Sequence, residues 1–134
     1  MKSNPRAAYL GASVSTASPS RLLVMLCDRL VLDVTRALRA QDAGDHAEAH
    51  RQLLHAQDIV TELRVSLAVD EWDGGPRLAA VYDFVHAELV RANTHRDRDR
   101  TDACLRLVSD IADMWRETAL RAAGAVLPGT PSVA

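Results

Sequence analysis

Ser18-Pro19-Ser20-Arg21-Leu22-Leu23-Val24-Met25-Leu26-Cys27 is the stretch that decides the fold. It predicts a helix start, because the Ser18 hydroxyl can accept from a free amide of the first turn and Pro19 has no amide to leave unpaired. The apolar run from Leu22 to Cys27 is too wide for a single helix face. We therefore expect a helix buried on more than one side, by the core and by the preceding arm or a partner.

Three further stretches before Gly124 show the same helical spacing of apolar residues, and no part of the sequence shows the alternation typical of strands. The connections between the helical stretches are short, which favours antiparallel neighbours. The sequence therefore predicts an all-α protein, an antiparallel up-down four-helix bundle. The expected helices are Pro19–Gln41, His46–Ala68, Leu78–His95 and Thr101–Ala123, and the expected connections are the turn Asp42–Asp45, the loop Val69–Arg77 and the charged turn Arg96–Arg100.

The ends of the chain differ from this central part. Residues 1–18 are expected to form an N-terminal arm that is too short to bury its own apolar side chains. A short extra helix within this arm is the alternative. Residues 19–123 form the bundle domain. Gly124 is expected to end the last helix, and residues 124–134, which have no periodic pattern, are expected to be a disordered tail.

Composition narrows the function classes. A chain of 134 residues with a formal net charge of −2 is expected to be one domain without the basic field that attracts nucleic acid. It contains neither an apolar run long enough to span a bilayer nor the pattern of a signal peptide. Cys27 and Cys104 lie far apart within helical patterns, as free cysteines of a reducing compartment do. We expect a soluble cytoplasmic protein that neither binds nucleic acid nor inserts into membranes.

The candidates for chemistry are weak. Asp83 and His86 have the spacing of one half of a di-metal motif, but no second copy exists. His46 and His50 could share a zinc ion, although a solvated polar face explains them better. Cys27 lies in an apolar stripe, where burial raises a thiol pKa and blocks access. The sequence predicts no enzyme, no catalytic residue, no metal and no cofactor.

Three other residues have open or structural interpretations. Tyr82 and Trp115 lie on the apolar stripes of their helices, so we expect both in the core, where each polar atom needs a partner. Gln57 lies beside core positions. It is either a satisfied polar group of the bundle or a hydrogen-bonding contact to a ligand helix.

Several short motifs follow one another along the chain. They are Tyr9-x4-Val14-x-Thr16-Ala17-Ser18-Pro19 followed by Leu22, Met25 and Leu26, the run Ala56-Gln57-Asp58-Ile59-Val60-Thr61-Glu62-Leu63, Gly74-Gly75 followed by Leu78 and Tyr82-Asp83-Phe84, then Leu89 with Ala92-Asn93, and Trp115. Together these motifs resemble the FliS family of flagellar export chaperones. One departure is Cys27-Asp28-Arg29, where the family often has an aromatic-acid-glycine triplet.

The resemblance implies a four-helix bundle that binds the disordered C-terminal segment of flagellin. Such a chaperone prevents premature polymerisation and keeps its client secretion-competent. In the family the client wraps around the bundle, and the N-terminal arm can occupy part of the site when the protein is free. Further partners that the resemblance allows are the export gate and other flagellar chaperones or regulators, with the chain a monomer or a weak homodimer.

The binding residues are inferred from the matching motifs. The arm and the first helix supply the apolar contacts, and the second helix supplies the rest. The alternative function is a helical adaptor or self-association module that has no affinity for flagellin. The expected partner-binding residues are Tyr9, Leu10, Val14, Leu22, Met25, Gln57 and Val60.

Overall fold

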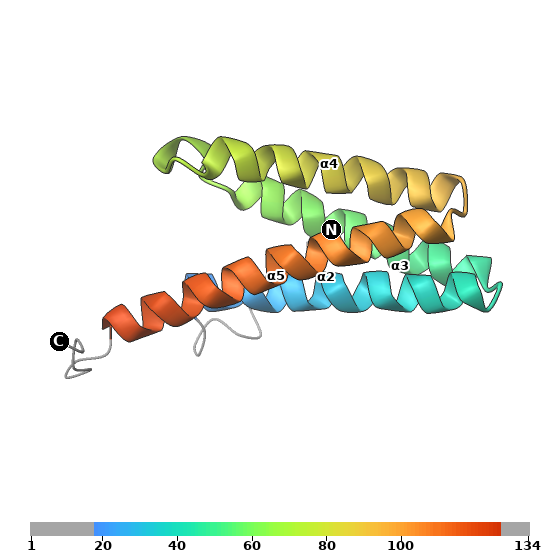
Figure 1. Cartoon of the computed structure of the whole chain (residues 1–134), viewed down its shortest axis with the longest axis horizontal. Helices are drawn as coiled ribbons and strands as arrows, with labels where there is room; N and C mark the ends of the chain where they lie inside the picture. Colours follow the sequence, from blue (N-terminus) through green and yellow to red (C-terminus); the bar gives the residue numbers. More distant parts are fainter. Residues whose placement is uncertain (1–17, 127–134) are drawn as a thin grey trace, which may run out of the picture.

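The computed structural model describes residues 18–126, which contain four α-helices, one short 3-10 helix and no strand (Figure 1). Each of α2 and α4 packs against both α3 and α5, so the helices follow one another around a bundle. The predicted all-α four-helix bundle is confirmed for this part of the chain. The elements are α2 (Pro19–Asp42), α3 (His46–Ser66), η1 (Val69–Glu71), α4 (Gly75–Thr94) and α5 (Arg98–Val126).

The predicted helix starts of α2 and α3 are confirmed by their caps. The Ser18 hydroxyl accepts from the backbone N–H of Arg21 at 3.2 Å. The Asp45 carboxylate accepts from the backbone N–H of Glu48 at 3.1 Å. These bonds satisfy donors that the first helical turn leaves free, so each helix begins where the sequence places it.

Other helix boundaries differ from the prediction, among them the start of α5, which is Arg98 rather than Thr101. α3 ends at Ser66, two residues early, and α4 begins at Gly75 rather than Leu78. Pro76 is compatible with this earlier start, because a first-turn residue needs no amide donor. α5 runs from Arg98 through Gly124 to Val126, so the predicted end at Gly124 is wrong. A single glycine costs a helix only about 1 kcal/mol, which does not by itself end it.

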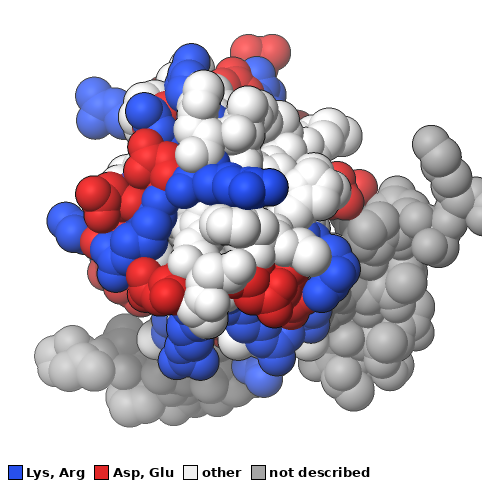
Figure 2. All heavy atoms as spheres, turned by 90° about the vertical axis from the view of Figure 1, so that its right-hand side faces the viewer, with Lys and Arg blue, Asp and Glu red and all other residues white. Residues whose placement is uncertain are grey.

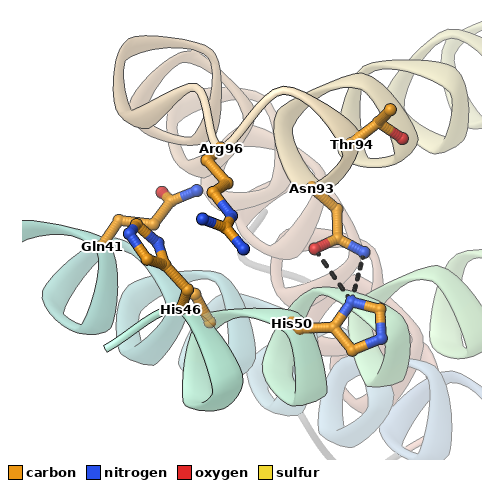
Figure 3. Close-up of a pocket in the computed structure, with 7 residues that line it drawn as sticks. Gln41, His46, His50, Asn93, Thr94 and Arg96 are labelled. Carbon is orange, nitrogen blue, oxygen red and sulfur yellow. Dashed lines mark hydrogen bonds between the residues drawn. The ribbon is translucent and has the colours of Figure 1, made fainter. Parts of the chain in front are cut away.

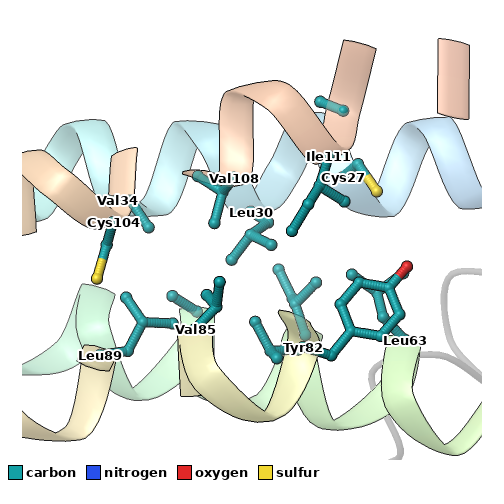
Figure 4. Packing of buried hydrophobic residues seen from close by; sticks show 14 of the residues in the cluster. Cys27, Leu30, Val34, Leu63, Tyr82, Val85, Leu89, Cys104, Val108 and Ile111 are labelled. Carbon is teal, nitrogen blue, oxygen red and sulfur yellow. The ribbon is translucent and has the colours of Figure 1, made fainter. Parts of the chain in front are cut away.

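The core is formed by apolar side chains from all four helices (Figure 4). Leu30 of α2, Leu53 and Leu63 of α3, and Leu89 of α4 are fully buried, and Val108 of α5 packs among them. The predicted apolar stripes therefore do face inward. None of the described helices combines the length and apolarity that a membrane crossing requires.

Tyr82 and Trp115 satisfy one another in this core. The indole Nε1 of Trp115 on α5 donates to the hydroxyl oxygen of Tyr82 on α4 at 2.8 Å. Tyr82 is buried and Trp115 is half-buried. The prediction that both pack in the core and need polar partners is confirmed, and their bond ties α4 to α5.

Replacing Tyr82 by phenylalanine should lower the free energy of unfolding by about 1 kcal/mol, because the indole N–H loses its acceptor while the ring packing is kept. Urea unfolding followed by far-UV circular dichroism measures the loss. The control is a double-mutant cycle with Trp115→Phe, made alone and together with Tyr82→Phe. If the loss of the double variant equals the sum of the two single losses, this hydrogen bond contributes nothing to stability.

Candidate partner-binding surface

α4 and α5 are held together near their connecting turn. The Glu88 carboxylate accepts from Arg91 on its own helix and from Arg100 on α5, each at 2.7 Å. These hydrogen bonds, the one from Arg91 foremost, lower the pKa of the Glu88 carboxyl. Towards their other ends the two helices diverge, as Figure 1 shows. The bundle is therefore closed at the α4–α5 turn and open at the start of α4.

An apolar groove lies between the diverging parts of α4 and α5. It encloses about 340 Å³, and Gly74 is one of its lining residues. Its charged residues are Arg77 and Asp110. Such a groove suits the apolar face of an amphipathic helix. Its apolar side chains, which define the α4–α5 groove, are Trp72, Leu78, Val81, Leu107, Ile111 and Met114.

Two glycines allow Trp72 to reach this groove. A Cβ on Gly74 would lie 2.1 Å from the Trp72 ring, and one on Gly75 would lie 2.1 Å from the backbone oxygen of Val69. Neither contact is possible for a residue with a side chain, so Gly74-Gly75 lets η1 fold tightly against the start of α4. The Trp72 side chain remains 44% exposed.

A smaller hollow lies on the other side of α4, between it and α3. It encloses about 210 Å³, and Val60 and Tyr82 are among its lining residues. Arg64 of α3 donates to Asp83 of α4 at 3.0 Å, and both residues line the hollow. Val65, another lining residue, is 74% exposed. α4 thus has an accessible depression on each of its two sides.

Two of the predicted binding residues lie on this side of α3. Val60 is buried and lines the α3–α4 hollow. Gln57 is half-buried and lies seven residues, or about two turns, from both His50 and Arg64. Since His50 contacts Asn93 of α4 and Arg64 contacts Asp83 of α4, the edge that contains Gln57 also faces α4.

The other predicted residues lie elsewhere. Leu22 and Met25 are half-buried near the start of α2. Leu22 lies eleven residues, about three turns, before Asp33, whose carboxylate contacts His55 of α3. Leu22 therefore lies along the α3-facing edge of α2, on the opposite side of α3 from Val60. Tyr9, Leu10 and Val14 fall outside the described residues.

Sequence reasoning named no residue of the α4–α5 groove as a binding residue. Val81, Leu107 and Met114 are half-buried, so periodicity alone makes them look like ordinary core-edge positions. The available signal was Trp72, a large apolar side chain in a polar loop where no helical stripe would bury it.

The candidates for chemistry do not assemble into an active site. Burial raises the pKa of Cys27 and that of Cys104 to about 12, so neither thiol is a nucleophile near neutral pH. Asp83 is paired with Arg64. Within residues 18–126, no group of three histidine, cysteine, aspartate or glutamate side chains could hold a metal ion.

A helical bundle with an open apolar groove beside its core has the architecture of a protein that can bind another polypeptide. Comparison with known proteins identifies which kind. The family model described as "Flagellar protein FliS" matches residues 2–122, and the chain belongs to the FliS family. This is a family of flagellar secretion chaperones and not of enzymes.

Individual relatives agree with the family assignment. The chain is 30% identical to the flagellar secretion chaperone FliS of Bacillus subtilis (strain 168). The alignment spans 114 residues, which are 85% of each of the two chains. It is 27% identical to the flagellar secretion chaperone FliS of Salmonella typhimurium, over 83% of this chain and 84% of the relative. The corresponding protein of Vibrio cholerae is 26% identical over 78% of this chain and 77% of its own.

Proposed function

We propose that this chain binds the C-terminal segment of a flagellin in the cytoplasm, prevents its premature polymerisation and keeps it competent for secretion. The observation that carries the proposal is the α4–α5 groove, an open apolar surface beside the core against which the apolar face of a partner helix can pack. The names of the relatives support a secretion client of the flagellum.

The groove suits a segment that is disordered when free. Ordering such a segment costs several kcal/mol, so a long apolar contact is needed rather than a few polar bonds. Trp72, Val81 and Leu107 offer apolar surface from η1, α4 and α5 along one depression. Arg77 and Asp110 can pair with charges that flank the apolar face of the client helix.

The client would extend beyond this groove. The α3–α4 hollow with Val60 lies on one side of α4, and the α4–α5 groove lies on the other. A segment that wraps around the bundle could contact both and then reach Leu22 and Met25. On this model the residues inferred from the sequence motifs and the α4–α5 groove are parts of one extended contact.

Calorimetric titration of the full chain with a peptide of the C-terminal segment of a flagellin from the same genome tests the proposal. We expect one-to-one binding with a large negative heat-capacity change, because apolar surface is buried. The fluorescence of Trp72 should shift to shorter wavelength as its exposed ring is covered. A Trp72→Phe variant is the control, since it removes this signal and leaves the emission of Trp115.

Absence of heat and of a fluorescence shift, with a correctly folded chain, would contradict the proposal. The self-association module would then be favoured if sizing experiments showed concentration-dependent dimers. That module would bury the same apolar groove against a second copy of the chain.

A further inference from the structure

A polar pocket lies at the end of the bundle opposite Trp72, between the α2–α3 and α4–α5 turns. It encloses about 320 Å³. Figure 3 shows the Arg96 guanidinium between His46 on one side and the His50–Asn93 pair on the other. No acidic residue lines it. The residues that define this end pocket are Gln41, His46, Ala49, His50, Asn93, Thr94 and Arg96.

The acidic side chains of the two turns are bound to other groups. Figure 2, which views this end of the bundle, shows acidic and basic side chains close together on its surface. Arg96 forms no ion pair with any residue in the described part of the chain, and it lines the pocket. Asp42 accepts from Arg98 at 2.7 Å, Asp45 from the Glu48 amide at 3.1 Å, Glu48 from Arg51 at 2.9 Å, and Asp97 from the Arg100 amide at 3.1 Å.

The backbone at Arg96 is unusual for an arginine. α2 and α4 end in the same way: the amide of Asp45 bonds to the carbonyl of Ala40 at 2.8 Å, and that of Asp97 to the carbonyl of Ala92 at 2.9 Å. The residue before each of these amides has a left-handed backbone conformation, with φ 73° at Gly44 and 49° at Arg96. Glycine adopts this conformation without strain, whereas arginine does not. The chain therefore keeps an arginine where glycine would fit the backbone better.

We propose that the end pocket binds a phosphate-type oxyanion, either free or as part of a small molecule. The Arg96 guanidinium supplies forked donors and the main positive charge. The Asn93 amide and the imidazoles of His46 and His50 supply further N–H groups. His50 Nδ1 lies 2.9 Å from Asn93 Nδ2 and 3.2 Å from Asn93 Oδ1, which holds both side chains at the pocket wall.

The arrangement favours a tetrahedral anion over a planar one. Its donors come from different walls, with Arg96 on the α4–α5 turn, Asn93 on α4 and His46 on α3. A phosphate has oxygens that point in several directions and can accept from all of these walls. A carboxylate accepts in one plane.

Titration of the full chain with inorganic phosphate, followed by two-dimensional amide NMR, tests the proposal. We expect saturable shifts confined to the turns and helix ends around Gln41, His50 and Arg96. Arg96→Gly should weaken phosphate binding at least about tenfold, because a charge-assisted bidentate contact is lost. Its melting temperature should not fall, since glycine suits the left-handed backbone. Arg21→Ala, which removes an exposed charge at the far end of α2, should leave binding unchanged.

Each alternative outcome overturns the proposal. Shifts that do not saturate, or that sodium chloride reproduces at equal ionic strength, would show only screening of surface charge. Equal affinity in Arg96→Gly would exclude the guanidinium as the anion ligand. Acetate that bound as tightly as phosphate would exclude a preference for tetrahedral oxyanions. Because the pocket and the α4–α5 groove lie at opposite ends of the bundle, flagellin binding by Arg96→Gly is measured separately and should be unchanged.

Discussion

Replacing Val81 by aspartate should weaken binding of the flagellin C-terminal peptide by about 100-fold or more, the loss typical of a central apolar contact at an interface. Val81 is half-buried in the α4–α5 groove, beside Leu107 and Met114. A carboxylate there would lose its hydration when an apolar client helix covers it. Val81→Ala should have a smaller effect in the same calorimetric titration, since it removes contacts without adding a charge.

The matched control is Leu120→Asp. Leu120 lies on α5, is 68% exposed and does not line the groove, so the same change of charge should leave affinity unchanged. Met25→Asp tests the residues inferred from the sequence motifs and should also abolish binding while helical content is kept. If Met25→Asp abolished binding and Val81→Asp did not, the start of α2 would be the main client site and the α4–α5 groove would not.

Removing the buried carboxylate of Asp33 should lower the free energy of unfolding by about 3 kcal/mol. Asp33 is fully buried on α2, accepts from Arg29 Nε at 2.9 Å and makes a short contact with His55 Nδ1 on α3. Asp33→Ala deletes the link between the two helices and leaves a void in its place. Asp33→Asn keeps the shape and one acceptor oxygen, so its loss should be smaller. Urea unfolding measures both variants.

Asp113→Ala is the comparison for this effect. Asp113 also pairs with an arginine, Arg116 at 3.4 Å, but its side chain is 76% exposed. An exposed pair of this kind contributes about 0.5 kcal/mol or less. Losses of equal size in Asp33→Ala and Asp113→Ala would mean that the buried carboxylate adds nothing beyond a surface ion pair.

Much of the fold could be predicted from local chemistry. Ser18 and Asp45 cap helices where predicted, because a cap depends on a side chain and amides three residues away. Leu30, Leu53 and Leu89 recur at helical spacing in the sequence, and all three are buried in the core. Boundaries were less accurate where no local signal decides them. α4 starts three residues early at Gly75, because η1 packs against its first turn, and Gly124 does not end α5.

The interaction surfaces depend on contacts between distant parts of the chain. Val81, Leu107 and Met114 have the spacing of core-edge residues, and only the divergence of α4 from α5 leaves them accessible. Arg96 reads as part of a solvated charged turn until the structure shows that neighbouring acids bind elsewhere. Likewise, the sequence analysis did not single out Asp33, which packing against α3 buries.

The sequence by itself determined the helices, the inward face of each and the family motifs, because these depend on residue types at fixed short spacings. Only the tertiary structure decided where the bundle opens and which charged side chains pair with one another. Those properties depend on the angles between packed helices and on partners tens of residues apart, as with Trp115 and Tyr82 or Arg98 and Asp42. Helical periodicity identifies the edge of a face, but a neighbouring helix determines whether that edge is covered.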